Sequence, residues 1–153
     1  NRNIKKFIFG GAIGLDQIAF EQAHLLKSEG LDIVLEVAVP FEQQDSMWIP
    51  ESKKLYREQL ELADNVVIVD ELEVYNPNNM EIGIYHEDKM ENRNKYMVDK
   101  SSIVIGVWDG SYGGTRNCIK YANKMFKEIV PLNPKTLPKS LDSIITQRKE
   151  LEL

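Results

Sequence analysis

Short apolar runs alternate with segments of helical periodicity along this chain. Runs rich in β-branched residues predict strands at Ile4–Phe9, Ile33–Val39, Val66–Val69, Ile103–Val107 and Ile129–Leu132. Apolar residues that recur at helical spacing predict helices over Leu15–Ser28, Pro50–Ala63, part of Asn79–Asp99, and Thr115–Phe126. Alternating strands and helices, with almost wholly apolar strands, are typical of a parallel sheet covered on both faces. The sequence therefore predicts an α/β fold, a three-layer sandwich with a mainly parallel sheet.

The length of 153 residues and the hydrophobic content of 42% are enough for one well-buried core and too little for two. We expect a single domain over residues 1–153, with residues 132–153 as a peripheral tail. Gly30 is expected to end the first helix, because glycine readily adopts the left-handed conformation of helix termini. The strand residues expected in the core are Phe7, Ile8, Val37, Val67, Val69, Ile103, Ile105 and Val107.

A glycine-rich turn, Trp108–Thr115, connects the fourth predicted strand to the last predicted helix. Backbone N–H groups converge at such a helix N-terminus, and the positive end of the helix dipole favours an anion there, above all a phosphate. A turn that needs glycine only for its geometry is the alternative reading. The same order of strand, glycine turn and helix occurs at Phe7–Gly14, followed by the helix from Leu15. Because ligands of open parallel sheets bind beyond the carboxyl ends of the strands, we expect the two turns to line one cleft for a phosphate or a nucleotide.

Charge and composition narrow the choice of partners. The net charge of −5 argues against broad nucleic-acid binding, which usually leaves a basic surface. No apolar run is long enough to cross a membrane, and no signal peptide opens the chain, so the cytoplasm is the expected location. The lone Cys118 is expected to be a packing residue, and His24 and His86 lack metal-ligand spacing, so no metal or other cofactor is expected.

Four ordered motifs resemble one known family. They are Gly10–Gln17, Val39–Gln44 with Trp48, Arg93–Ser101 and Trp108–Thr115. In this order and spacing they resemble the YpsA-like branch of the SLOG superfamily, which is named after the Smf/DprA proteins and the LOG enzymes. The resemblance covers Phe7 to about Pro131. It implies a Rossmann-like fold and a nucleotide-related ligand, in proteins of bacteria and their phages.

The chain departs from the family pattern in two places. YpsA-like proteins usually begin with an additional strand and a Thr-Gly-His-Arg-Pro-like loop, whereas this sequence opens at the following strand. The chain is then either a short form or lacks a preceding part, and a partner chain would cover that side of the cleft. LOG enzymes carry a glutamate just after their glycine signature, and here Gly114-Thr115 is followed by Arg116, Asn117 and Cys118. The resemblance therefore favours a cleft that binds its ligand without cutting it.

The residues expected to contact ligand lie in the two glycine turns and the segment after the second strand: Gly10, Gly11, Ala12, Gly14, Asp16, Glu42, Asp109, Gly110, Ser111, Gly113, Gly114, Thr115 and Asn117. Asp16 either accepts a ribose hydroxyl or only stabilises the helix N-terminus. Arg116 either pairs with a phosphate or is a solvated helix charge. Phe41, Trp48 and Trp108 either flank a base or pack in the core, with core packing favoured. No catalytic residue is expected.

We expect this chain to bind a nucleotide or a nucleotide-derived small molecule, such as an ADP-ribose-like or cyclic-nucleotide signal, without turning it over. The first alternative is an enzyme of LOG or deoxyribosyltransferase type that cleaves or transfers an N-ribosidic bond, with Asp16, Glu21 or Asp109 as the carboxylate. The second is DprA-like binding of single-stranded DNA, which the acidic charge disfavours. The sequence is also compatible with a homo-oligomer.

Overall fold

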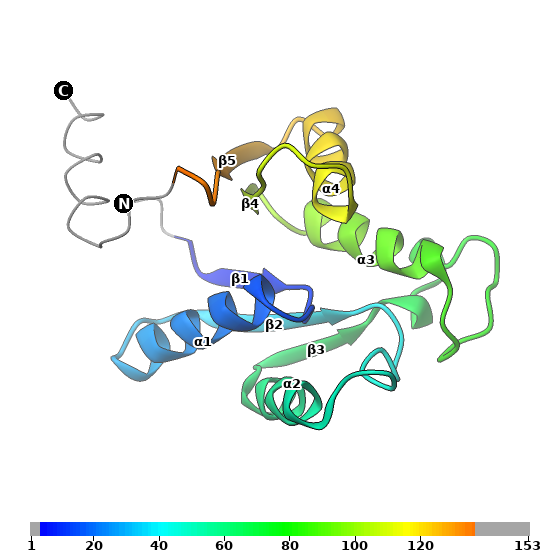
Figure 1. Ribbon diagram of the computed structural model, residues 1–153, viewed down its shortest axis with the longest axis horizontal. Coiled ribbons are helices and arrows are strands. Elements are labelled where there is room, and N and C mark those ends of the chain that lie inside the picture. Colours follow the sequence, from blue (N-terminus) through cyan, green and yellow to red (C-terminus); the bar gives the residue numbers. More distant parts are fainter. Residues whose placement is uncertain (1–3, 137–153) are drawn as a thin grey trace. The chain divides into compact units, whose positions relative to one another are not determined.

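A computed structural model describes residues 4–136 and places them in an α/β arrangement (Figure 1). The chain divides into two compact units, Asn1–Ser102 and Ile103–Leu153. Most of the predicted peripheral tail, residues 137–153, lies outside the described residues. The elements of the first unit are β1 (Lys6–Phe9), α1 (Leu15–Ser28), β2 (Val34–Val39), α2 (Pro50–Leu62), β3 (Asn65–Ile68), the short 3₁₀ helices η1 (Val69–Glu71) and η2 (Glu73–Tyr75), and α3 (Glu87–Asp99). The second unit holds β4 (Ile103–Val107), α4 (Gly114–Lys124) and β5 (Glu128–Leu132).

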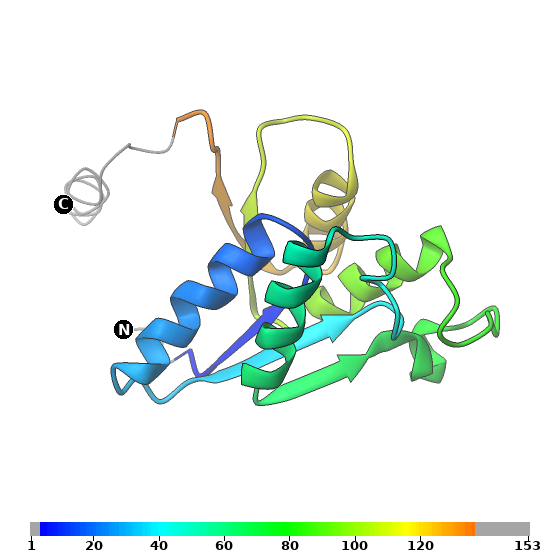
Figure 2. The same ribbon diagram turned by 60° about the horizontal axis from the view of Figure 1, so that its bottom comes forward.

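The first unit is built on a three-stranded parallel sheet in the order β1-β2-β3. Figure 2 shows α1 and α2 side by side in front of these strands, and α3 packs on the opposite face against β2 and η1. Alternate residues of β2 point to opposite faces, as the pleat of a strand requires. Leu35, Val37 and Val39 join the core beneath α1 and α2, whereas Ala38 joins Tyr96 of α3 on the other face. This unit therefore has three layers and an all-parallel sheet, as predicted.

Local sequence signals set the helix ends of this unit. Gly30 has a φ of +100° after α1, and the N–H of Leu31 donates to the carbonyl of Leu26 at 3.1 Å, which closes a Schellman motif. The prediction that Gly30 ends the helix is confirmed. Proline opens α2 at Pro50, where its missing N–H costs nothing. The Nδ1 atom of His86 accepts from the N–H of Asp88 and caps α3.

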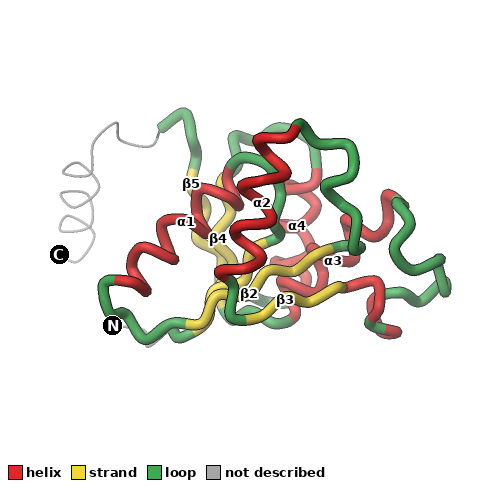
Figure 3. Tube along the Cα trace, turned by 90° about the horizontal axis from the view of Figure 1, so that it is seen from below, coloured by secondary structure: helices red, strands yellow, loops and turns green. Residues whose placement is uncertain are grey.

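The second unit is a β-α-β element. Strands β4 and β5 pair in parallel, with Ile103 opposite Glu128 and Val107 opposite Leu132, and appear as neighbouring yellow segments in Figure 3. Helix α4 packs on both strands. A Cβ at Gly106 would lie 2.9 Å from Cδ1 of Ile119, so glycine lets α4 approach the strand closely. Every strand pair within residues 4–136 is parallel, and the predicted α/β, Rossmann-like fold class is confirmed.

Several core expectations need correction. Ile105 is 59% exposed, because Gly106 faces α4 and the neighbouring residue of the pleated strand faces away. Phe126, expected on the apolar side of the last helix, is 96% exposed, because α4 stops at Lys124 and Phe126 turns into the left-handed region at φ +53°. Val37 and Val69 are buried, whereas the other five predicted core residues are half-buried: Phe7, Ile8, Val67, Ile103 and Val107.

Among the described residues, no helix is both long enough and apolar enough to cross a lipid bilayer. Within the same part of the chain, the side chains of His, Cys, Asp and Glu form no group of three that could hold a metal ion.

Candidate functional site

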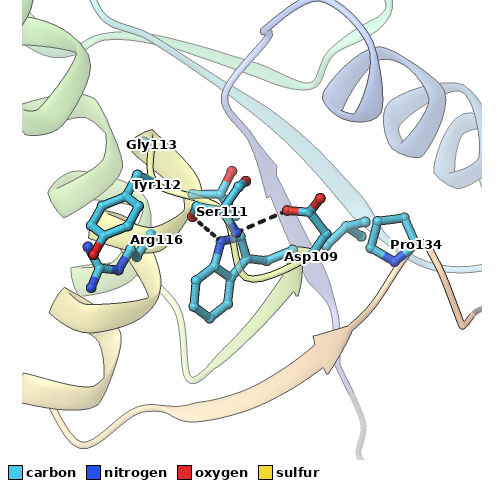
Figure 4. Close-up of a pocket in the computed structure, with 10 residues that line it drawn as sticks. Asp109, Ser111, Tyr112, Gly113, Arg116 and Pro134 are labelled. Atoms are coloured by element: carbon cyan, nitrogen blue, oxygen red, sulfur yellow. Dashed lines mark hydrogen bonds between the residues drawn. The ribbon is translucent and has the colours of Figure 1, made fainter.

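A pocket of about 180 Å³ lies at the carboxyl end of β4, where the glycine turn enters α4 (Figure 4). Its ten lining residues are Val107, Trp108, Asp109, Ser111, Tyr112, Gly113, Gly114, Thr115, Arg116 and Pro134. Ligand pockets for whole drug-sized molecules usually measure about 300–1,000 Å³. The volume therefore suits one group of a ligand, such as a phosphate, better than an entire dinucleotide.

Short-range hydrogen bonds fix the turn that forms this pocket. The indole Nε1 of Trp108 donates to the carbonyl of Ser111 at 2.6 Å. The backbone N–H of Ser111 donates to Oδ1 of Asp109 at 3.0 Å, an Asx turn that Figure 4 shows as a dashed line. Both backbone groups of Ser111 are thus bonded within the turn, which holds the following glycines in place.

The N-terminus of α4 opens into the pocket without a side-chain cap. Gly113 is the N-cap residue with φ +152°, a conformation that favours glycine, and there is open space around the position of its missing Cβ. The first backbone N–H groups of a helix have no partner within the helix. Those of Gly114, Thr115 and Arg116 occupy this position, at the positive end of the helix dipole. The turn therefore offers backbone donors to an anion.

Arg116 and Tyr112 form one side of the pocket. The guanidinium Cζ of Arg116 lies 4.0 Å from the centre of the Tyr112 ring, a cation–π contact (Figure 4). The contact orients the charge beside the N-terminus of α4. That Arg116 pairs with a phosphate stays a prediction.

Asp109 and Pro134 lie on the opposite side of Ser111 in Figure 4. The second carboxylate oxygen of Asp109, Oδ2, pairs with Nζ of Lys135 at 3.0 Å. The hydrogen bonds from Ser111 and Lys135 hold the pKa of Asp109 far below its usual range. Asp109 is therefore a carboxylate at every physiological pH, with both oxygens engaged.

The first glycine turn, Gly10–Gly14, is held from beneath by buried polar side chains. The guanidinium of Arg93, from α3, donates to the carbonyl of Gly10. The amide Nε2 of Gln44 donates to the carbonyl of Gly11 at 3.3 Å. Arg93 is 5% exposed and Gln44 is 8% exposed. The turn is therefore anchored by its carbonyl groups to the interior of the first unit.

Asp16 occupies the N-terminal turn of α1 and binds the same loop. Its Oδ2 accepts from the N–H of Ala12 at 3.1 Å, and Oε1 of Gln17 lies 3.4 Å from the N–H of Gly14. A Cβ at Gly10 would lie 2.5 Å from Nη1 of Arg93 and 2.8 Å from Oδ2 of Asp16. The carboxylate of Asp16 and the buried guanidinium of Arg93 thus both lie close to Gly10.

Residues 1–137 match the model of the YpsA family, described as the YspA SLOG family. This chain belongs to that family. It is 40% identical over 124 residues to the uncharacterized SPbeta prophage-derived protein YoqJ of Bacillus subtilis, across 81% of this chain and 72% of that protein. It is 28% identical over 112 residues to the UPF0398 protein BH1768 of Halalkalibacterium halodurans, across 73% of this chain and 54% of that protein. A UPF0398 protein of Bacillus thuringiensis is 25% identical over 122 residues, across 80% of this chain and 61% of that protein.

The family that the four sequence motifs indicate is therefore confirmed. Membership of the SLOG family suggests a nucleotide-related binding fold. In the second unit the pocket brings together five of the predicted site residues, whereas Gly110 and Asn117 do not line it. The five are Asp109, Ser111, Gly113, Gly114 and Thr115. In the first unit Gly10, Gly11, Ala12, Gly14 and Asp16 form one turn, and Glu42 lies exposed in the segment after β2. That the two turns line one cleft stays a prediction.

Three residues with a part in these turns were not among the predicted site residues: Gln44, Arg93 and Lys135. Gln44 and Arg93 both belong to the motifs that resemble the family, and this membership could have marked them as site residues. Lys135 follows the last strand in a polar segment, where nothing in the sequence distinguishes it from other surface lysines. Phe41 is buried, and Trp48 packs on Tyr56 with ring centres 5.2 Å apart, so both have the core role that was favoured.

Proposed function

We propose that this protein binds a nucleotide-derived small molecule through a phosphate group held at the N-terminus of α4, and that it does not turn the ligand over. The observation that carries the proposal is the uncapped start of α4 inside a pocket that also holds Arg116. Helix N-termini bind phosphate through backbone N–H groups and the helix dipole. An arginine beside them adds charge-assisted hydrogen bonds.

The first glycine turn, in the other unit, offers a ligand different chemistry. Asp16 already accepts the N–H of Ala12 and carries negative charge, so a phosphate at this turn would be repelled. A carboxylate held in this way suits a hydroxyl donor. We therefore assign a sugar hydroxyl, rather than a phosphate, to the turn Gly10–Gly14 and Asp16.

The state of Asp109 supports binding without turnover. Cleavage of an N-ribosidic bond needs a carboxylate beside the anomeric carbon, and protonation of the leaving group needs an acid. Asp109, the one carboxylate among the ten pocket-lining residues, is bonded through both oxygens and has a strongly lowered pKa, which makes it a poor proton donor. Its position in the pocket is nevertheless the observation that favours the second candidate function, N-ribosidic cleavage with Asp109 stabilising the positive sugar carbon.

Native mass spectrometry of the purified chain, followed by calorimetry with ADP-ribose, AMP and cyclic AMP, tests the binding. We expect at least one of these ligands to bind, and Arg116→Gln to weaken that binding by about tenfold or more, since a hydrogen bond to a charged group contributes about 1.5–3 kcal/mol. Lys120→Gln is the matched control, because Lys120 is an exposed lysine on the same helix outside the pocket. Equal affinities for wild type and Arg116→Gln would remove the phosphate from this pocket.

Incubation of the chain with AMP and ADP-ribose, with chromatography for free base, tests the absence of turnover. We expect the ligands to be recovered intact. Base release that disappears in Asp109→Asn while ligand affinity persists would establish the enzyme instead. Binding to oligonucleotides with a steep salt dependence would point to a DNA-binding protein.

A further inference from the structure

Lys135 belongs to neither glycine turn, yet it contacts the one carboxylate of the α4 pocket. Its Nζ lies 3.0 Å from Oδ2 of Asp109, and the side chain of Lys135 is 70% exposed while that of Asp109 is 30% exposed. Lys135 itself does not line the pocket, whereas its neighbour Pro134 does. The lysine therefore pairs with the carboxylate without lining the pocket itself.

The contact between Lys135 and Asp109 matters because the pocket lining carries charges of both signs. Arg116 is the cationic side chain among the lining residues, and Asp109 is the anionic one. An anion at the N-terminus of α4 would be attracted by Arg116 and repelled by Asp109. Two charges a few ångströms apart near a protein surface interact strongly enough to change an affinity severalfold.

We propose that Lys135 makes the α4 pocket selective for anions by neutralising Asp109, without contacting the ligand itself. The inference rests on the proposed phosphate site and adds what determines its charge preference. Asp109 is needed for the turn, because its Oδ1 accepts the N–H of Ser111. The carboxylate thus serves the geometry of the loop, and Lys135 offsets its charge where a phosphate is to bind.

The bonding around Asp109 supports this division of roles. Its two oxygens have separate partners, Ser111 for Oδ1 and Lys135 for Oδ2, so the lysine can be removed without breaking the Asx turn. Lys135 is itself placed by a local turn, in which its N–H donates to Oδ1 of Asn133 at 2.9 Å. The two oxygens of Asp109 therefore serve separate contacts, one within the turn and one with the lysine.

Calorimetry with ADP-ribose, AMP and cyclic AMP on four variants tests the inference. We expect Lys135→Gln to weaken phosphate-ligand binding about tenfold and Lys135→Arg to keep it, and Asp109→Asn is the reference for the double variant. The decisive variant is Lys135→Gln/Asp109→Asn, in which the affinity returns to that of Asp109→Asn, because no negative charge is left to neutralise. Lys120→Gln controls for the loss of one positive charge on the same unit.

Each outcome separates the inference from the proposal beneath it. A double variant as weak as Lys135→Gln would overturn the inference, because the lysine would then act directly on the ligand. Absence of binding by the wild type to all three ligands would end the proposed function, and the inference with it. An NMR titration of the Asp109 carboxyl is independent of any ligand: its pKa rises in Lys135→Gln if the lysine offsets its charge, and an unchanged pKa refutes that role.

Discussion

The two glycine turns of this chain follow the same sequence order and have opposite surroundings. Gly10–Gly14 rests on buried side chains that take up its carbonyl groups, and a Cβ at Gly11 would lie 3.0 Å from Cε2 of Tyr56. In the second turn, residues 110–115 are exposed, and there is open space where a Cβ of Gly113 would lie. At Gly10 and Gly11 of the first turn, other side chains fill the space that glycine leaves. At Gly113 of the second turn that space is open.

A glycine-rich turn before a helix is therefore not in itself a phosphate site. Neither α1 nor α4 has a side-chain cap, but the carboxylate of Asp16 accepts from the N–H of Ala12 and lies close to Gly10, whereas the space beside Gly113 is open. The difference predicts that substitutions in the first turn chiefly lower stability. Equivalent substitutions in the second turn chiefly lower affinity.

Valine at the two turns is expected to give the largest contrast. Gly11 has φ +63° and faces Tyr56, Gln44 and Val37 within 3.0–3.2 Å, so Gly11→Val should cost about 3 kcal/mol or more of unfolding free energy from overpacking and a left-handed backbone. Gly114 is exposed at the first turn of α4, so Gly114→Val should change stability by less than about 1 kcal/mol. Urea unfolding measures both.

The same two variants separate the binding roles. Gly114→Val should abolish binding of the phosphate ligand in calorimetry, because the side chain fills the anion's position. Gly114→Ala, which adds one methyl group, is the milder control. Unchanged affinity in Gly114→Val would show that the α4 turn does not hold the phosphate.

Two arginines give the next contrast. Arg93 is buried and donates to the carbonyl of Gly10, so Arg93→Met should cost about 1–3 kcal/mol by leaving a buried acceptor unpaired. Arg116 lies over the ring of Tyr112, and Arg116→Met should cost under about 1 kcal/mol, the value of an exposed cation–π contact. Thermal unfolding followed by circular dichroism measures both. Equal losses of stability would contradict the distinction between the two turns.

Periodicity predicted the strands and helices well, because the apolar pattern of each element is local. Helix α1 has the expected bounds, Leu15–Ser28, and β4 has the expected bounds, Ile103–Val107. The different roles of the two glycine turns could not be predicted in this way. They depend on Arg93 and Gln44, which lie 83 and 33 residues from their partners in the chain. Likewise, Lys135 acquires its role only because β5 returns the chain beside β4.

Substitution of the two loop carboxylates, Asp16 and Asp109, should lower stability more in the first turn than in the second. Asp16 is half-buried and stabilises both the N–H of Ala12 and the N-terminus of α1, so Asp16→Asn should cost about 1 kcal/mol of stability. It should also weaken binding of adenosine, a probe with sugar hydroxyls and no phosphate. Asp109→Asn should leave the unfolding midpoint almost unchanged. Undiminished adenosine binding by Asp16→Asn would remove the sugar hydroxyl from this turn.

The smallest effect at neutral pH is expected for the phenol beneath the first turn. Tyr56 is 1% exposed, and among the described residues its hydroxyl makes no hydrogen bond of good geometry, although Gln44 lies close enough to lower its pKa, so Tyr56→Phe should change stability by less than about 0.5 kcal/mol at pH 7. A larger loss would mean that the hydroxyl has a partner, such as a buried water. Burial raises the pKa of Tyr56 from 10.0 to about 12. The folded state therefore holds this proton more tightly than the unfolded state, and the resulting stability is complete below pH 10 and is lost as the pH rises to about 12. Urea unfolding between pH 8 and pH 12 should show a shallower decline for Tyr56→Phe than for the wild type, and identical declines would show that the phenol ionises freely in the folded protein.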